Sequence, residues 1–327
     1  MLNQMKILFI YHDPCTDGFL ARIIAECYYS TSEQKNQVTY VGVNPSTLSA
    51  DLERCLGDNK DNFDQILMFD VSLSPEHLDK LLSASKNVKI FDHHESTEKA
   101  FAGTINVSNI ITFDNTKCGA HLAFSYFYPG LPLPTVVKYV EVRDLWLFGK
   151  PRDLPNSKAI TTYLYEVPFL IPFKDASNYF HMILNSDSCN WDNIIQEGNR
   201  MLREVDLAAE QIVNRMVAVN LNPNLNPNPT QNPNNNNLKV LVVETDKYVS
   251  EAGNMAIKKY PDVDFILMWS LDAKKNIKIS LRSDASHCNV NNIARQLWGG
   301  GGHAAAAGAL ISDETKKNEF SNLFLGI

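Results

Sequence analysis

The chain has 327 residues, which favours two domains because one domain takes roughly 100–200 residues. Hydrophobic residues make up 44% and charged residues 20%, which excludes a small disulfide-stapled protein and is typical of a globular chain. The net charge of −7 excludes a broad basic surface for coating duplex nucleic acid, although a local basic groove is compatible with it. The six cysteines are scattered without a CxxC pair, which predicts reduced thiols.

No targeting or membrane segment is expected. The N-terminal apolar run stops at His12, so it resembles a first buried strand and not a signal peptide. No stretch reaches the roughly 18–20 apolar residues that a spanning helix needs. The sequence therefore predicts a cytoplasmic protein that does not enter a membrane.

Short apolar runs alternate with helical patterns through residues 1–150. The apolar runs are Lys6–Tyr11, Gln37–Val43, Gln65–Phe69 and Val88–Phe91. The helical patterns cover Phe19–Tyr29, the region near Ser46–Leu56, Gly119–Tyr126 and Thr135–Val142. This alternation predicts an α/β domain with a parallel sheet and helices on both faces. Ligand sites in such sheets lie beyond the carboxyl ends of the strands.

A different organisation follows residue 150. Residues 151–220 have mostly helical patterns, including an amphipathic stretch over Asn193–Val219, and we expect a helical connector there. Residues 222–237 contain nine Asn and four Pro, a composition that cannot bury a core and predicts a disordered loop. The remaining patterns predict a smaller α/β domain over 221–327, with strands at Leu238–Val243, Val263–Ser270 and Ile277–Arg282, the last two paired, and helices near Ala252–Lys259 and Asn291–Leu297.

Three strand-like runs of the first domain are followed by residue types that bind metals. These residues are His12 with Asp17, then Asp70, then the sequence Asp92–His93–His94; Asp144 follows a helical pattern further along. A single Asp after a strand is usually a turn or a helix cap, but the repetition favours a shared site. Carboxylates crowded at one edge repel each other unless cations neutralise them. Two divalent metals would solve this problem and would also clamp a phosphoryl group and activate a water.

Seven short motifs together resemble a known family. HDPCTDGFLA at 12–21, FDVS at 69–72, FDHHES at 91–96 and VRDLW at 142–146 resemble, in order, the four motifs of the DHH phosphoesterase superfamily. SEAGNMA at 250–256, SLRS at 280–283 and GGGGHAAAAGA at 299–309 resemble the DHHA1 domain that often follows. The resemblance implies a DHH catalytic domain at 1–150 and a DHHA1 substrate-binding domain at 221–327.

The resemblance also implies roles for the matching residues. It implies a ligand set of His12 for one metal, Asp17, His93 and Asp144 for a second metal, and Asp70 bridging both. It further implies that His94 faces the scissile phosphate and that Asp92 orients the histidine pair. A carboxylate that fixes a ligand histidine is a general need of such sites.

Cys15 departs from the family pattern, which usually has Asp at this position. Here the nearest Asp is residue 13. Either Cys15 is a ligand, or Asp13 reaches the metal, or the first metal site is weakened. Oxygen and imidazole ligands suit Mn²⁺ or Mg²⁺, whereas a thiolate shifts the preference toward Zn²⁺ or Fe²⁺. We expect Cys15 to be a ligand and two Mn²⁺ ions to be the cofactor, with Mg²⁺, Zn²⁺ or Fe²⁺ as alternatives.

The glycine run at 299–302 is the main signal of the second domain. It predicts a flexible loop, and the bare amides of such a loop bind anions well. Arg282 ends an apolar strand, where its guanidinium suits bidentate phosphate capture. By resemblance, the substrate's phosphate would be held by Arg282, Gly300, Gly301, Gly302 and His303, in a cleft between the domains.

The sequence therefore predicts a metal-dependent phosphoesterase that hydrolyses phosphodiester or phosphomonoester bonds of short oligonucleotides or small nucleotides. A short substrate fits a net acidic chain better than a long duplex does. The alternatives are a nucleic-acid-binding protein with a degenerate active site and a pyrophosphatase or polyphosphatase. The sequence indicates no obligate protein partner and leaves a homodimer open.

Overall fold

The computed structural model describes residues 4–33, 36–45, 47–57, 63–103, 107–170, 173–185, 190–221 and 237–325. The chain divides into two compact units, Met1–Leu202 and Arg203–Ile327. The division falls inside one long helix, α9 (Trp191–Asn214), so residues of the expected helical connector 151–220 are shared between the two units.

The first unit contains a parallel sheet of five strands. Its strands are β1 (Lys6–His12), β2 (Gln37–Val43), β3 (Gln65–Phe69), β4 (Val88–Asp92) and β5 (Ile111–Phe113), in the spatial order β2-β1-β3-β4-β5. All neighbouring pairs are parallel, which confirms the predicted parallel sheet. The three-residue strand β5 was not expected, because a run this short has too few apolar residues to stand out.

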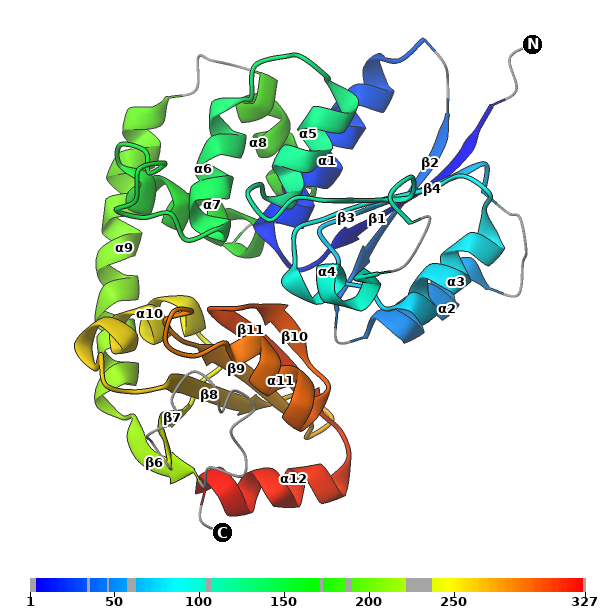
Figure 1. Cartoon of the computed structure of the whole chain (residues 1–327). Helices are drawn as coiled ribbons and strands as arrows, with labels where there is room; N and C mark the ends of the chain where they lie inside the picture. Colours follow the sequence, from blue (N-terminus) through cyan, green and yellow to red (C-terminus); the bar gives the residue numbers. More distant parts are fainter. Residues whose placement is uncertain are drawn as a thin grey trace. The chain divides into compact units, whose positions relative to one another are not determined.

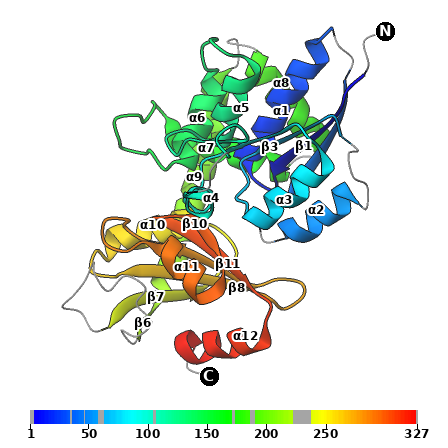
Figure 2. The same ribbon diagram turned by 45° about the vertical axis from the view of Figure 1, so that its right-hand side comes forward.

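Helices cover both faces of this sheet (Figure 1). They are α1 (Thr16–Thr31), α2 (Leu48–Leu56), α3 (Pro75–Ala84), α4 (Glu95–Phe101), α5 (Gly119–Phe127), α6 (Thr135–Asp144), α7 (Ser157–Leu170) and α8 (Phe173–Asn185). Helices α1 and α5 to α8 pack on the sheet face that carries Phe9 and form one hydrophobic core with it. Helices α2 to α4 pack on the opposite face, which carries Leu8, and form a second core. Helices α1 and α5 lie side by side in both views (Figure 1, Figure 2).

A ladder of aromatic rings stiffens the centre of the sheet. Phe9, Phe69 and Phe91 stand on adjacent strands, with ring centroids 5.2 Å and 4.6 Å apart. All three rings are buried, and stacked aromatic pairs add to the stability gained from burial alone. Two of these rings, Phe69 and Phe91, directly precede Asp70 and Asp92 in the chain. The ladder therefore supports the backbone from which those carboxylates project.

The strand order places a topological switch between β1 and β3. The chain leaves β1 to form β2 on one side and then crosses to form β3 on the other side. In open α/β sheets, the crevice at such a switch point is where ligands bind, outside the carboxyl ends of the strands. His12 ends β1 and Asp70 follows β3, so both residues flank this point.

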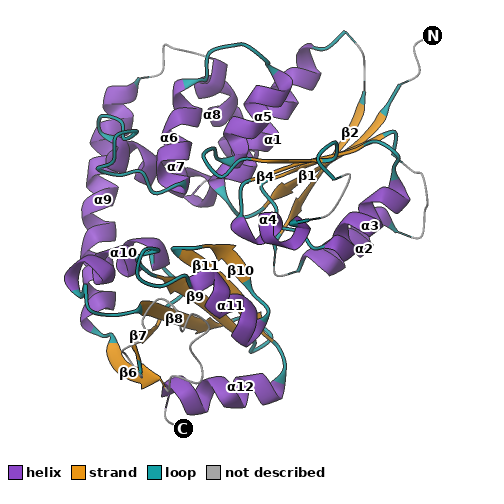
Figure 3. Cartoon of the chain, in the orientation of Figure 1, coloured by secondary structure: helices purple, strands orange, loops and turns teal. Residues whose placement is uncertain are grey.

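The second unit is a smaller α/β domain, as predicted, built on a mixed sheet of six strands (Figure 3). Its strands, in the order β10-β11-β9-β8-β7-β6, are β6 (Val217–Leu221), β7 (Leu238–Glu244), β8 (Phe265–Leu271), β9 (Ile277–Arg282), β10 (Gly301–His303) and β11 (Ala306–Ile311). The helices are α10 (Val249–Lys259), α11 (Val290–Trp298) and α12 (Glu314–Phe320), followed by the π-helical turn Ser321–Leu325. Strands β8 and β9 pair antiparallel, which confirms the expected pair.

Two expectations for this unit need correction. The helical pattern over Asn193–Val219 runs only to Asn214, because Val217, Val219 and Leu221 alternate with a period of two and extend the sheet as β6. The glycine run is not a flexible loop: Gly299 ends α11 with a φ of 71°, and Gly301 begins strand β10.

Residues 222–236 of the expected Asn-rich loop lie outside the described residues. Among the helices in the described part of the chain, none combines the length and the apolar character needed to cross a bilayer.

Candidate metal centre

The carboxyl ends of β1, β3 and β4 bring the predicted ligands of the first unit together. Tyr11 pairs with Phe69, and Phe69 pairs with Phe91, so the residues that follow them emerge at the same edge of the sheet. Parallel strands lie about 4.8 Å apart, which is close enough for side chains at neighbouring ends to share one site.

Asp70 stands at the centre of this group. Its Oδ1 lies 3.0 Å from Nε2 of His93, and its Oδ2 lies 3.3 Å from Nδ1 of His12. The residue has a φ of 62°, in the left-handed region that Asp tolerates better than most residues, and such backbone strain often marks a functional site. One carboxylate thus faces two imidazoles, each from a different strand end.

Asp17 is held by the start of another helix. The residue lies in the first turn of α1, and its carboxylate accepts hydrogen bonds from the backbone amides of Gly119 at 2.5 Å and Ala120 at 2.8 Å. A Cβ on Gly119 would lie 2.5 Å from Cβ of Asp70 and 3.0 Å from Oδ2 of Asp17. Only glycine therefore allows the first turn of α5 to approach both carboxylates.

The ligand-type atoms near Asp70 form overlapping groups, one of which consists of Asp70, Asp92, His93 and His94. His12, Cys15 and Asp70 each offer an atom within 4.8 Å of the others, and Asp17, His93 and Asp144 do the same. Nε2 of His93 lies 3.6 Å from Asp144 and 3.9 Å from Asp17. The 3.0 Å contact between His93 and Asp70 joins the second set to the first.

Cys15 and Asp13 lie in different surroundings. Cys15 is half-buried and belongs to the set with His12 and Asp70. Asp13 is exposed, and its side chain packs against the backbone of Gly42 on the neighbouring strand β2. The geometry therefore favours Cys15 over Asp13 as the side chain that faces the first set.

Asp92 holds His94 at the end of β4. Its Oδ1 lies 2.7 Å from Nδ1 of His94, and the hydroxyl of Thr97 donates to its Oδ2. Asp92 and Thr97 are buried, whereas His94 is half-buried and its ring centroid lies 4.5 Å from that of His93. This arrangement fixes the His94 ring next to the ligand-type groups.

Burial and mutual repulsion disturb the acids of this centre. Burial, followed by the charges of Asp70 and Asp144, raises the pKa of Asp17 to about 8. Burial also raises the pKa of Asp144 to about 6, against the opposing effect of His93. Burial raises the pKa of Asp70 less than its two imidazole partners lower it, so its pKa lies well below the usual range.

The imidazoles respond in the opposite sense. Burial lowers the pKa of His93, but the charge of Asp144 and the contact with Asp70 outweigh it and raise the pKa to about 10. Burial likewise opposes the rise at His12, whose pKa is lifted well above 6.5 by Cys15 and Asp70. Without cations, protons neutralise the carboxylates that burial has forced together.

The donor chemistry fits divalent cations. Oδ2 of Asp70 and Oδ2 of Asp144 are buried and accept no hydrogen bond among the described residues. Each oxygen faces an imidazole nitrogen, at 3.3 Å and 3.6 Å, without a hydrogen bond, as expected of groups that hold a cation between them. Imidazole and carboxylate together suit Mn²⁺, Fe²⁺ and Zn²⁺.

Sequence reasoning missed residues that support this centre. Gly119 and Ala120 were expected only to start a helix, although they bond a carboxylate 102 and 103 residues earlier in the chain. Glu141 on α6 is buried, bonds His121 at 2.5 Å and pairs with Arg152, which fixes the same helix start. The Gly-Ala pair is a weak signal for such a role, and Glu141 has no sequence signal.

In the second unit, Arg282 is anchored at the end of β9. Its guanidinium donates to the hydroxyl of Ser250 at 2.9 Å and to the carbonyl of Leu281 at 2.8 Å. Its side chain crosses Gly253 on α10, where a Cβ would lie 2.5 Å from Cγ of Arg282. Ser250, the first residue of the motif at 250–256, therefore positions the arginine.

His303 lies on the same face of the sheet as Arg282. His303 pairs with Ala306, and Ala306 pairs with Arg282, so the three residues form one row across β10, β11 and β9. Directly opposed residues of a sheet point to the same face, and two strand spacings are about 10 Å. Arg282 and His303 therefore flank the small side chain of Ala306.

The glycines beside this row serve packing and capping. The amides of Gly299 and Gly300 donate to the carbonyls of Arg295 and Ala294 in the last turn of α11. A Cβ on Gly300 would lie 2.0 Å from the carbonyl oxygen of Gly308. The amide of Gly300 is thus already bonded and faces its own helix end, which a sequence reading cannot reveal.

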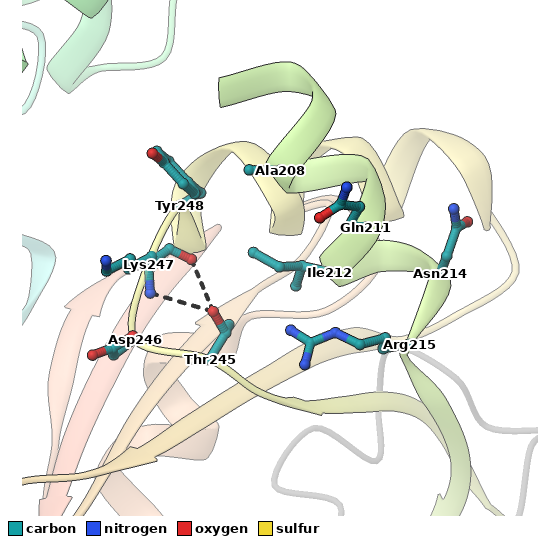
Figure 4. A pocket seen from close by; sticks show the side chains of 9 residues that line it. All are labelled: Ala208, Gln211, Ile212, Asn214, Arg215, Thr245, Asp246, Lys247 and Tyr248. Atoms are coloured by element: carbon teal, nitrogen blue, oxygen red, sulfur yellow. Dashed lines mark hydrogen bonds between the residues drawn. The ribbon is translucent and has the colours of Figure 1, made fainter. Parts of the chain in front are cut away.

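A separate open hollow of about 660 Å³ lies in the second unit (Figure 4). Residues from the end of α9 and from the segment before α10 line it, including Ile212, Arg215 and Lys247. Lys247 and Arg215 are exposed, and no predicted site residue lines the hollow. It contributes nothing to the metal centre.

Comparison with known proteins agrees with this architecture. The family model described as the DHHA1 domain matches residues 235–326. The chain is 26% identical over 317 residues to uncharacterized protein R106 of Acanthamoeba polyphaga mimivirus, covering 95% of this chain and 68% of that protein. It is 40% identical over 73 residues to oligoribonuclease NrnB of Bacillus subtilis, covering 22% of this chain and 17% of that protein.

A solved structure shares the fold. RecJ from Thermus thermophilus, in complex with Mn²⁺, aligns with a TM-score of 0.50 at 14% identity, over 97% of this chain and 51% of that chain. This chain therefore spans about half the length of that protein.

The DHHA1 match and the similarity to an oligoribonuclease support a hydrolase of the phosphoesterase class. More particularly, the DHHA1 match over residues 235–326 and the similarity to NrnB support the DHH/DHHA1 phosphoesterase superfamily that the sequence motifs resemble.

Proposed function

We propose that this protein is a metal-dependent phosphoesterase that hydrolyses phosphodiester or phosphomonoester bonds of short oligonucleotides or small nucleotides. One observation carries the proposal: a set of ligand-type atoms that contains Asp70 meets a second set through the 3.0 Å contact between Asp70 and His93, at the carboxyl edge of the parallel sheet. A site that binds a single cation has no need of a second complete set.

The residues divide between two cations. His12, Cys15 and Asp70 would hold one cation, and Asp17, His93 and Asp144 would hold the other together with Asp70. When bound, such a pair offsets the carboxylate charge, lowers the pKa of a water and polarises the phosphoryl group. The amides of Gly119 and Ala120 keep Asp17 in place, and Asp92 keeps His94 beside the scissile phosphate.

The second unit would grip the substrate. Arg282 presents a guanidinium that suits the two oxygens of a phosphate, and His303 adds a second polar group in the same row. Gly300 and Gly302 shape this surface by letting the backbone approach β11 closely, and Gly301 pairs with Gly308. Substrate-binding residues on one unit and metal ligands on the other account for the two-domain chain.

A short oligoribonucleotide is the favoured substrate. NrnB, with which 73 residues share 40% identity, is named an oligoribonuclease. A net charge of −7 also favours a short ligand held at a local site over a long duplex held along the surface. The intact ligand sets argue against the alternative of a degenerate, purely nucleic-acid-binding site.

Mn²⁺ is the favoured ion, and Cys15 is the feature that tests this choice. Five of the six ligand residues offer oxygen or imidazole nitrogen, which Mn²⁺ accepts readily. The thiol of Cys15 moves one of the two sites toward Fe²⁺ or Zn²⁺.

A turnover panel with added Mn²⁺ tests the function. The substrates are the dinucleotide pApA, a cyclic dinucleotide, pAp and pyrophosphate, so that the one consumed identifies the branch. Asp70→Asn keeps the left-handed backbone but removes the shared charge, and we expect it to lower turnover by at least about 10³-fold, comparable to the loss of a key electrostatic group. Asp13→Asn, at an exposed position, is the matched control and should retain activity.

Three results would contradict the proposal. No turnover of any panel member by the Mn²⁺-loaded wild-type protein would favour a binding protein with a degenerate site. Full turnover by the Asp70→Asn variant would show that the shared carboxylate plays no part. Consumption of pyrophosphate alone would replace the nucleotide substrate by an inorganic one.

A further inference from the structure

Tyr165 on α7 has a buried hydroxyl that forms no hydrogen bond among the described residues. The residue as a whole is half-buried, and its ring packs at the border of the main core of the first unit. Buried side-chain hydroxyls nearly always have a partner, so an unpaired one needs an explanation. No sequence motif singled out this residue.

The hydroxyl lies in the electrostatic field of the metal centre. Burial raises the pKa of Tyr165 most, and the nearby charges of Asp144, Cys15 and Asp17 raise it further. Cys15 belongs to the first ligand set, and Asp17 and Asp144 belong to the second. The phenol therefore lies near groups of both sets, although none of these three groups accepts a hydrogen bond from it.

The ring of Tyr165 is held by a stack. The guanidinium carbon of Arg143 lies 5.1 Å from the centroid of Tyr165 and 5.1 Å from that of Trp146. Arg143 precedes Asp144 in the chain, so the same turn of α6 carries a ligand and the group that fixes the ring. Cation–π stacking of this kind limits the motion of the phenol.

We propose that the hydroxyl of Tyr165 donates a hydrogen bond to a non-bridging phosphoryl oxygen of the substrate bound at the metal centre. This inference rests on the proposed function, because it needs a phosphoryl group there. A phenol is a donor without charge, so it binds an anionic oxygen without competing for the cations' ligands. A phosphoryl oxygen is the acceptor that the chemistry of the centre supplies and that the protein lacks.

The test uses the full chain, Mn²⁺ and inorganic phosphate. Tyr165→Phe removes only the hydroxyl, and we expect the affinity of the Mn²⁺-loaded protein for phosphate to fall about tenfold, as for the loss of one hydrogen bond to a charged acceptor. Isothermal titration calorimetry measures the affinity for phosphate. The electron paramagnetic resonance signal of free Mn²⁺ measures the affinity for the metal, which should not change. Tyr163→Phe, on the same helix, is the matched control and should leave both affinities unchanged.

The outcomes separate the two proposals. A wild-type protein that binds no Mn²⁺ would overturn the proposed function and this inference with it. Wild-type binding of Mn²⁺ and phosphate, with the same phosphate affinity in Tyr165→Phe, would overturn the role of Tyr165 alone. A parallel loss of Mn²⁺ affinity in Tyr165→Phe would also overturn it, because the hydroxyl would then support the metal ligands and not the phosphate.

Discussion

The strand ends of the first unit and the glycine run of the second unit, Gly299–Gly302, both carry short motifs, but the two regions use them differently. At the strand ends, side chains far apart in the chain converge on Asp70. In the glycine run, the amides of Gly299 and Gly300 are bonded to the end of α11, and the missing side chains allow close packing. The same strength of sequence signal thus marks a chemical centre in one unit and a packing requirement in the other.

The difference teaches how each motif should be interpreted. A motif of ligand-type side chains after a buried strand keeps its meaning in the fold, because parallel strands place their ends at one edge. A run of glycines allows several backbone conformations, so its role depends on what packs against it. Substitutions at Gly119, Gly300 and Cys15, together with the pH dependence of the metal-free centre, test the two halves of this comparison.

Gly119→Ala should have the largest effect, because it places a methyl group inside the metal centre. The new Cβ would lie 2.5 Å from Cβ of Asp70 and 3.0 Å from Oδ2 of Asp17, both in the buried interior. We expect a loss of about 3 kcal/mol of stability from overpacking and at least about a tenfold loss of Mn²⁺ affinity. Chemical unfolding and Mn²⁺ titration measure the two effects.

Gly130→Ala is the control, because nothing lies within 4 Å of its Cβ position and its φ of +81° should cost only about 1 kcal/mol. Equal effects of the two substitutions would mean that the start of α5 does not approach the carboxylates closely.

Gly300→Ala should destabilise the second unit more than Gly299→Ala does. A Cβ at 300 would lie 2.0 Å from the backbone oxygen of Gly308, whereas the Cβ position at 299 is open and carries only the strain of a φ of +71°. We expect a difference of about 2 kcal/mol between the variants in urea unfolding. If the run were a flexible loop, both substitutions would lower the free energy of unfolding by the same small amount.

The metal-free protein should lose stability as the pH rises from 5 to 9. The pKa of Asp17 is raised to about 8 and that of His93 to about 10, so the folded chain binds more protons than the unfolded chain across this range. The free energy of unfolding therefore falls with rising pH, and we expect a fall of about 2 kcal/mol. Thermal unfolding at several pH values measures it.

Saturating Mn²⁺ should flatten or reverse this slope, because ligands bind a metal in their deprotonated form. Asp17→Asn should flatten it in the metal-free protein. A metal-free protein whose stability does not change between pH 5 and 9 would contradict the crowding of carboxylates at this edge.

Cys15→Asp should have the smallest effect, a change in metal preference. Replacing a thiol by a carboxylate favours Mn²⁺ over Zn²⁺, and we expect the ratio of the two affinities to shift by about tenfold. The near-ultraviolet thiolate-to-metal absorption of the Co²⁺-loaded protein should appear in wild type and vanish in the variant. Asp13→Asn should leave both unchanged; a variant of Cys15 that keeps the wild-type ratio would remove Cys15 from the ligand set.

Much of the first unit could be predicted from the sequence. The runs that became β1, β3 and β4 are nearly all apolar, because both faces of the parallel sheet are covered there. His12, Asp70 and His93 stand directly at strand ends, so the topology alone predicts that they gather. Strand β6 was missed because edge strands this short resemble the end of an amphipathic helix.

The sequence by itself determined the order of the elements, the residue types at the strand ends and the presence of a second α/β domain, since these depend on local periodicity and on residues adjacent in the chain. Tertiary packing was needed to establish that the amides of α5 hold Asp17, that Cys15 and not Asp13 lies with His12, and that the hydroxyl of Tyr165 is buried without a hydrogen-bond partner among the described residues. These choices depend on contacts between segments up to about 150 residues apart, and the physical reason is that packing, not local preference, sets which groups meet.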